Sequence, residues 1–164
     1  MNLEAINSIA QLIAAIGVIA SLFYLAAQIR QNTRSTRAMA VDGLTRGIAE
    51  ILSGQTPETL RGFARVMENF DGASEDDRLR AIPQLFALFK LFENAWFQQR
   101  QGTLDQEQWQ GWDAYIRTYY HQPGVKSWWS MRRPAFALGF RDYLESSEAI
   151  EQMTKLSEMI ERQP

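Results

Sequence analysis

A run of 25 residues without a charged side chain lies near the start of the chain, between Glu4 and Arg30. About 20 apolar residues in a helix are enough to cross a hydrocarbon layer roughly 30 Å thick. A buried helix of a soluble protein would also be apolar, but here the apolar residues occur nearly all round the helix, which favours lipid. We therefore expect a transmembrane helix over residues 1–30.

The first residues of the chain argue against a cleaved signal peptide. Such a signal begins with basic residues and has a shorter apolar core than this one. Here the start is Met-Asn-Leu-Glu, which contains no basic side chain. We expect the helix to be kept as an anchor.

Arg30, Arg34 and Arg37 follow the apolar run, whereas Glu4 precedes it. Cytoplasmic flanks of membrane helices carry an excess of Lys and Arg. This bias predicts an N-terminus outside the cytoplasm and a cytoplasmic C-terminal domain. Clustered cations at a membrane surface also attract anionic headgroups, so we expect the three arginines to contact membrane lipid as well as to set the orientation.

The first helix is expected to continue beyond the membrane. Residues 31–52 contain no proline, their apolar side chains recur at helical spacing, and Ser53-Gly54 is a plausible stop. We predict a transmembrane helix over residues 1–30, a cytoplasmic extension of the same helix as a stalk over 31–54, and a helical bundle over 55–164.

Small residues recur along this first helix at spacings that let two helices approach closely. One strip lies in the apolar run and the other in the extension; together they comprise Ala10, Ala14, Gly17 and Ser21, and then Ala40, Gly43 and Gly47. Both strips are predicted helix–helix contacts. They favour a homo-oligomer or association with another membrane protein.

The remainder of the chain has the punctuation of short helices. Thr56-Pro57, Ser74 and Asp105 each precede a helical pattern. The predicted later boundaries are an end at Pro123-Gly124, a helix over 125–131, another over 135–145 and a last one over 147–162. No alternating strand pattern is present, so the fold class is all-α.

Aromatic residues are concentrated in one part of the chain: 15 of the 19 lie between Phe86 and Tyr143. Core packing is one interpretation, and a pocket or docking face is another. The residues assigned to that pocket or face are Trp96, Trp109, Trp112, Tyr119, Trp128 and Trp129. Because adjacent residues point in different directions on a helix, we expect at least one of Trp128 and Trp129 to lie outside the core. The pair could then contact the bilayer surface.

The chain offers little for chemistry. It has no cysteine and one histidine, His121, and no phosphate-binding, metal or nucleophile motif. After Arg37 the chain has 14 basic and 18 acidic residues, and an acidic balance argues against nucleic acid. Asp113 could pair with His121, but Arg117, four residues on, is the expected partner. We expect no enzyme, no cofactor and no metal.

The segment from Tyr24 to Arg34, Tyr-Leu-Ala-Ala-Gln-Ile-Arg-Gln-Asn-Thr-Arg, resembles a group of small uncharacterised bacterial membrane proteins. These begin with a hydrophobic helix that runs into a Gln-Ile-Arg-Gln-Asn-Thr stretch. The resemblance covers residues 4–37 and is looser in the aromatic C-terminal part. It implies a single-pass protein of the bacterial inner membrane and brings no activity.

These observations predict a membrane-anchored interaction or scaffold protein, which either self-associates or is an accessory subunit of a membrane complex. The alternative is a membrane-tethered sensor or carrier that binds an apolar ligand or lipid in its aromatic-rich bundle.

Overall fold

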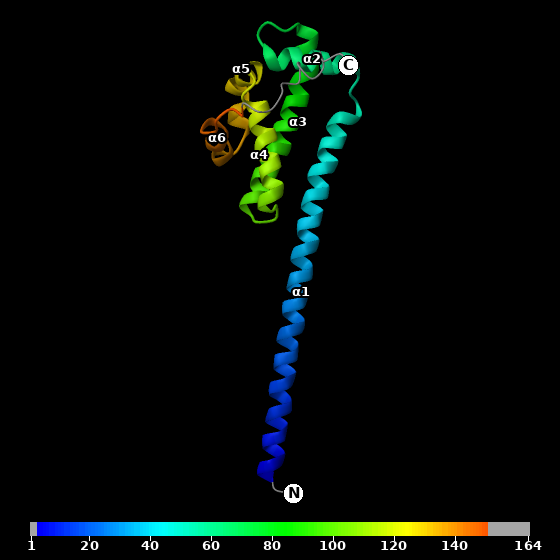
Figure 1. Ribbon diagram of the computed structural model, residues 1–164, viewed down its shortest axis with the longest axis vertical. Helices are drawn as coiled ribbons and strands as arrows, with labels where there is room; N and C mark the ends of the chain where they lie inside the picture. The colour runs from blue at the N-terminus through cyan, green and yellow to red at the C-terminus, as the bar shows by residue number, and fades with distance from the viewer. Residues whose placement is uncertain (1–2, 151–164) are drawn as a thin grey trace. The chain divides into compact units, whose positions relative to one another are not determined.

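The computed structural model describes residues 3–150, and within them the chain is all-α, with no strand. The predicted long N-terminal helix followed by a helical bundle is confirmed (Figure 1). The elements in order are α1 (Leu3–Ser53), α2 (Pro57–Glu68), α3 (Glu75–Arg100), α4 (Gln106–Tyr120), α5 (Pro123–Arg132), the 3-10 turn η1 (Arg133–Ala135) and α6 (Leu138–Glu145).

The chain divides into two compact units, Met1–Met39 and Ala40–Pro164. The first is the N-terminal part of α1. Its described side chains are exposed, and α1 is long and apolar enough to cross a membrane. Hydroxyl groups along it bond to its own backbone: Ser21 Oγ donates to the carbonyl of Gly17 at 2.8 Å, and Thr33 Oγ1 donates to that of Ile29 at 2.9 Å.

The helix starts of the second unit follow the predicted caps. The Thr56 hydroxyl accepts from the backbone of Thr59, whose own hydroxyl accepts from the backbone of Thr56, so the two form a reciprocal capping box. Ser74 caps α3 and Asp105 caps α4 by accepting from the backbone N–H three residues on. Each bond satisfies a helix N–H that has no partner in its own helix.

Pro123 and Gly124 do not end α4 as predicted, because α4 already stops at Tyr120 and these two residues open α5. Proline suits the first turn of a helix, where its missing N–H would have no partner. The helix predicted over 135–145 is also shorter, since η1 precedes α6. The helix predicted over 147–162 does not include residues 147–150, which are non-helical. Its remainder lies outside the described residues.

The core of the second unit lies among α2, α3, α4, α5 and α6. Leu85, Phe89, Phe92, Val125 and Phe140 are fully buried there. Both Trp128 and Trp129 are buried as well, with 1% and 3% of their surface exposed, so the expectation that one of them faces outward is wrong. α5 packs against α2, α4 and η1, and a helix with several packing partners can bury neighbouring residues.

The two tryptophans share neighbours, since the rings of Phe89 and Phe136 pack against both of them. Trp128 lies against Phe89, with ring centroids 5.1 Å apart. Trp129 lies against Phe136, at 4.8 Å, and its indole Nε1 donates to Glu145 Oε1 at 3.2 Å. Burial among these rings removes both tryptophans from the bilayer surface.

Candidate functional site

The six aromatic residues assigned to a pocket or docking face do not line one cavity. Trp128 and Trp129 belong to the core, and Trp96 is half-buried against Phe140. Trp109 packs on Tyr143, with ring centroids 5.7 Å apart. Core packing therefore accounts for most of the aromatic concentration: Tyr119 also packs against buried Phe92, and of the six only Trp112 lines a separate feature.

That feature is a shallow apolar groove of about 470 Å³ in the second unit. It is lined by Ile48 of α1 and, from α4, by Gln108, Gly111, Trp112 and Tyr115. A Cβ at Gly111 would meet no atom within 4 Å, so the floor of the groove is open there. Its size lies in the range of small-ligand pockets, and its openness also suits a helix or an acyl chain.

The last turns of α1 form one wall of this groove. Leu44 is buried with Ala95 and Leu104, and Val41 and Leu91 pack beside them. A Cβ at Gly47 would lie 2.7 Å from Leu91 Cδ1, so glycine lets α1 approach α3 closely. Gly47, predicted as a helix–helix contact, therefore makes that contact within this chain.

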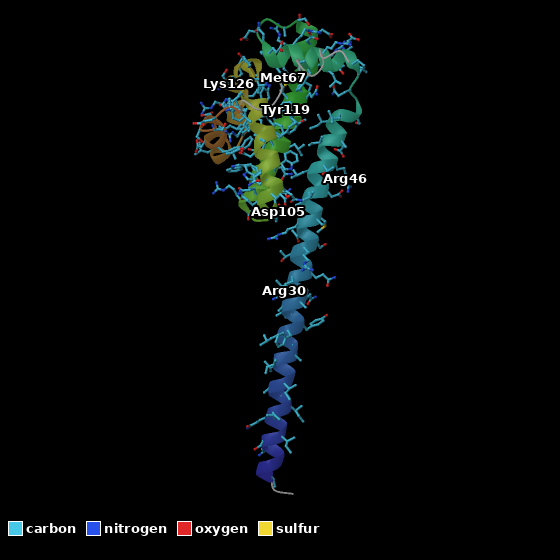
Figure 2. The ribbon with its side chains drawn as sticks, viewed as in Figure 1. Arg30, Arg46, Met67, Asp105, Tyr119 and Lys126 are labelled. Atoms are coloured by element: carbon cyan, nitrogen blue, oxygen red, sulfur yellow. The ribbon has the colours of Figure 1, made fainter. Side chains whose placement is uncertain are left out.

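Buried Phe92 of α3 packs against the aromatic residues of α4 beside the groove. Its ring meets those of Trp112, Tyr115 and Tyr119 edge-on, with centroid distances of 6.4, 5.6 and 5.8 Å. The Tyr115 hydroxyl donates to the Tyr119 hydroxyl at 3.2 Å, and burial raises the pKa of Tyr119 above its ordinary value. Tyr119 is labelled in Figure 2 and belongs to α4. Tyr115, held in this way, offers the groove an aromatic surface.

A polar network lies on another face of α4. The Tyr143 hydroxyl donates to Asp113 Oδ1 at 2.6 Å, and Arg117 Nη1 pairs with Asp113 Oδ2 at 3.2 Å. Arg117 Nε also donates to the carbonyl of Glu148 at 2.8 Å. The expected Asp113–Arg117 pair is confirmed. Burial and the Asp113 carboxylate both raise the pKa of Tyr143.

His121 bonds to Ser147 rather than to Asp113. Its Nε2 lies 3.0 Å from Ser147 Oγ. Burial lowers the pKa of this imidazole, and the positive charges of Lys126 and Arg117 lower it further. The imidazole fastens the segment after α6 to the end of α4.

A second polar cluster, which the sequence did not single out, connects α3 to the start of α6. Lys90 Nζ pairs with Glu93 Oε2 and donates to the carbonyl of Ala135, both at 2.7 Å. Glu93 Oε1 accepts from the backbone N–H of Ala137 at 2.6 Å, and Lys90 lies 4.5 Å from the Phe136 ring centroid. The i, i+3 spacing of Lys90 and Glu93 is a signal from which their ion pair could be predicted, but their contacts with the segment from the end of η1 to the start of α6 depend on the tertiary fold.

The remaining predicted site residues lie on α1. Arg30, Arg34 and Arg37 are exposed, as are Ala14, Gly17, Ser21 and Gly43, while Ala40 is half-buried and the side chain of Ala10 lies outside those described. A Cβ at Gly17 or Gly43 would meet nothing within 4 Å. Among the described residues, no group of three His, Asp or Glu side chains is placed to hold a metal ion.

Comparisons with protein families, with curated proteins and with solved structures found no match.

Proposed function

We propose that this chain is a membrane-anchored helical interaction protein, which self-associates or serves as an accessory subunit of a membrane complex. The observation that carries the proposal is the exposure of the apolar part of α1. None of its most apolar stretch is buried against the rest of the described chain. Exposure of such an apolar surface to water would be energetically unfavourable. In a membrane the same surface contacts the lipid, as in a single-pass anchor.

The arginines support a particular orientation. Arg30, Arg34 and Arg37 are exposed at the C-terminal end of the apolar run, which favours a cytoplasmic location for the second unit and an N-terminus on the other side. The resemblance of residues 4–37 to bacterial single-pass proteins favours the inner membrane. Contact of the arginines with anionic headgroups is compatible with this orientation.

The second unit supports a role in binding rather than catalysis. Its strongest ionic and polar contacts connect elements of the fold, as Asp113 does with Tyr143 and Lys90 does with Ala135. Its apolar groove at Trp112 is open at the surface. These features are typical of a domain that presents a surface.

Native mass spectrometry of the full chain, released from its own membrane in mild detergent, tests the proposal. A homo-oligomer of fixed size or a stoichiometric second polypeptide is the expected result. A protein that is monomeric at all concentrations and has no companion polypeptide would contradict it.

The groove favours one alternative, a tethered carrier or sensor of an apolar ligand such as a lipid. Gly111→Trp fills the groove without meeting a neighbouring atom within 4 Å of its Cβ. If the alternative holds, a fluorescent fatty acid binds the unmodified chain, and this variant abolishes binding. Exposed Gly54, whose Cβ would also meet nothing, offers the matched control Gly54→Trp. Equal binding by all three proteins would exclude the groove as the site.

A further inference from the structure

The three side-chain amides of the apolar run, Asn7, Gln11 and Gln28, share one face of α1 with Ser21. From Asn7 to Ser35, the residues reached by alternating steps of four and three positions form a single stripe. We call this the amide stripe, and its members are Asn7, Gln11, Ala14, Val18, Ser21, Leu25, Gln28, Asn32 and Ser35. It includes every Asn and Gln between residues 5 and 30. All of its members are exposed.

Steps of four and three residues are the repeat of helices that pack along one another as a left-handed pair. A helix turns about 100° per residue, so the stripe stays on one face and drifts only slowly. The predicted small-residue contacts Ala14 and Ser21 belong to it, and Gly17 lies at its edge. The stripe therefore combines polar groups with small side chains that permit close approach.

Among the described residues, no hydrogen-bond partner is found for the side-chain amides of Gln11 and Gln28. Ser21, by contrast, is satisfied by the carbonyl of Gly17. An amide in hydrocarbon that has no partner is unfavourable because lipid tails offer neither donor nor acceptor. A partner helix would remove that cost.

The charges lie away from this face. Arg30, Arg34 and Arg37 each follow a stripe residue by two positions, which places them about 160° round the helix from it. On the stripe itself they would repel one another across an interface, whereas on the opposite face they point to headgroups. The stripe is thus uncharged and able to form hydrogen bonds, and the three arginines lie on the opposite face of the helix.

We infer that the partner of the amide stripe is a second copy of this chain, packed parallel to the first. This deepens the proposed function and rests on its membrane insertion. Copies inserted with one orientation bring each stripe residue to the same depth as its counterpart. A carboxamide both donates and accepts, so Gln11 can pair with Gln11 and Gln28 with Gln28. An unrelated helix would need matching polar groups at the same depths.

Cysteine cross-linking tests this arrangement directly because the chain contains no cysteine. Single cysteines are placed on the stripe at Val18, Ser21 and Leu25, and on the opposite face at Ile16, Ile19 and Phe23. Membranes containing each full-length variant are washed at alkaline pH and then oxidised. Disulfide-linked dimers should form at the stripe positions and be at least several-fold fewer at the opposite positions.

Two results would overturn the inference in distinguishable ways. Membrane-bound protein with no dimer, or with dimers equally frequent on both faces, would reject the stripe but leave the anchor intact. Protein that the alkaline wash releases would reject the proposed anchor and the inference together.

A second measurement determines how much the side-chain amides contribute to the affinity of the dimer. In sedimentation equilibrium of the full chain in micelles, the double variant Gln11→Leu and Gln28→Leu should raise the dimer dissociation constant about tenfold, since interhelical hydrogen bonds contribute modestly. Thr33→Leu, a polar-to-apolar change off the stripe, is the control and should change it less than about twofold. An unchanged constant in the double variant would contradict the inference.

Discussion

Gly124, in the first turn of α5, lies directly against the carbonyl of Val66 near the end of α2. A Cβ at this position would overlap that oxygen and would also lie 2.7 Å from the backbone nitrogen of Phe70. Because the atoms it would meet belong to the backbone, no side-chain rotation can relieve the overlap. The approach of α5 to α2 therefore requires glycine here.

Gly124→Ala should lower the free energy of unfolding of the second unit by about 2 kcal/mol or more, because α2 and α5 must move apart. Thermal unfolding of the full chain in detergent, followed by tryptophan fluorescence, measures the effect. Gly111→Ala is the matched control. Its Cβ meets nothing, and it should be neutral or stabilise the helix by up to about 1 kcal/mol. Equal stability of the two variants would contradict the close contact.

Tyr143→Phe should destabilise the second unit by about 1–2 kcal/mol, because it removes the hydroxyl that donates to the Asp113 carboxylate. Tyr115→Phe removes a bond between two neutral hydroxyls and should cost less, about 0.5–1 kcal/mol. Chemical unfolding of the two variants in the same detergent compares them. A larger loss for Tyr115→Phe would mean that the Asp113 network does not hold α6 to α4.

The pKa of His121 should lie below the ordinary value of about 6.5, because burial and the charges of Lys126 and Arg117 disfavour its protonated form. At a pH between the folded-state and unfolded-state pKa of His121, the unfolded chain binds more protons than the folded chain. His121 therefore contributes stability that is present above the ordinary pKa and is lost as the pH falls through the folded-state pKa. NMR titration of the single histidine measures the value directly. A value above 6.5 would contradict the described environment.

Local features of the second unit could be predicted from the sequence where they depend on neighbouring residues. The caps at Thr56, Ser74 and Asp105 and the Asp113–Arg117 pair are examples, since each involves side chains and backbone groups within one turn. The exposure of the apolar part of α1 likewise follows from its composition.

Features that depend on packing between distant segments could not be predicted. Pro123-Gly124 has the composition of a chain break, but its glycine is required by the backbone of α2, which only the fold brings near. Trp128 and Trp129 are both buried because α5 packs against α2, α4 and η1, and the spacing of residues in α5 alone does not contain this information. The groove at Trp112 combines α1 with α4 and was likewise not apparent.

Replacing Arg30, Arg34 and Arg37 together with Glu should scramble the orientation of the chain, because these cations provide the charge bias on the C-terminal flank. Exposed Ser130, changed to Cys, reports the location of the second unit. In intact cells an impermeant maleimide should not label the otherwise unmodified chain and should label a substantial fraction of the triple variant. Unchanged protection in the triple variant would contradict a topological role.

Alkaline carbonate extraction of membranes tests most directly whether α1 is an anchor. The full chain should remain in the membrane pellet, as should the control Ile16→Leu and Ile19→Leu. The variant Ile16→Arg and Ile19→Arg should be released, since each arginine at the centre of a membrane helix costs about 2.5–3.5 kcal/mol on the insertion scale. Recovery of the unmodified chain in the soluble fraction would contradict the account.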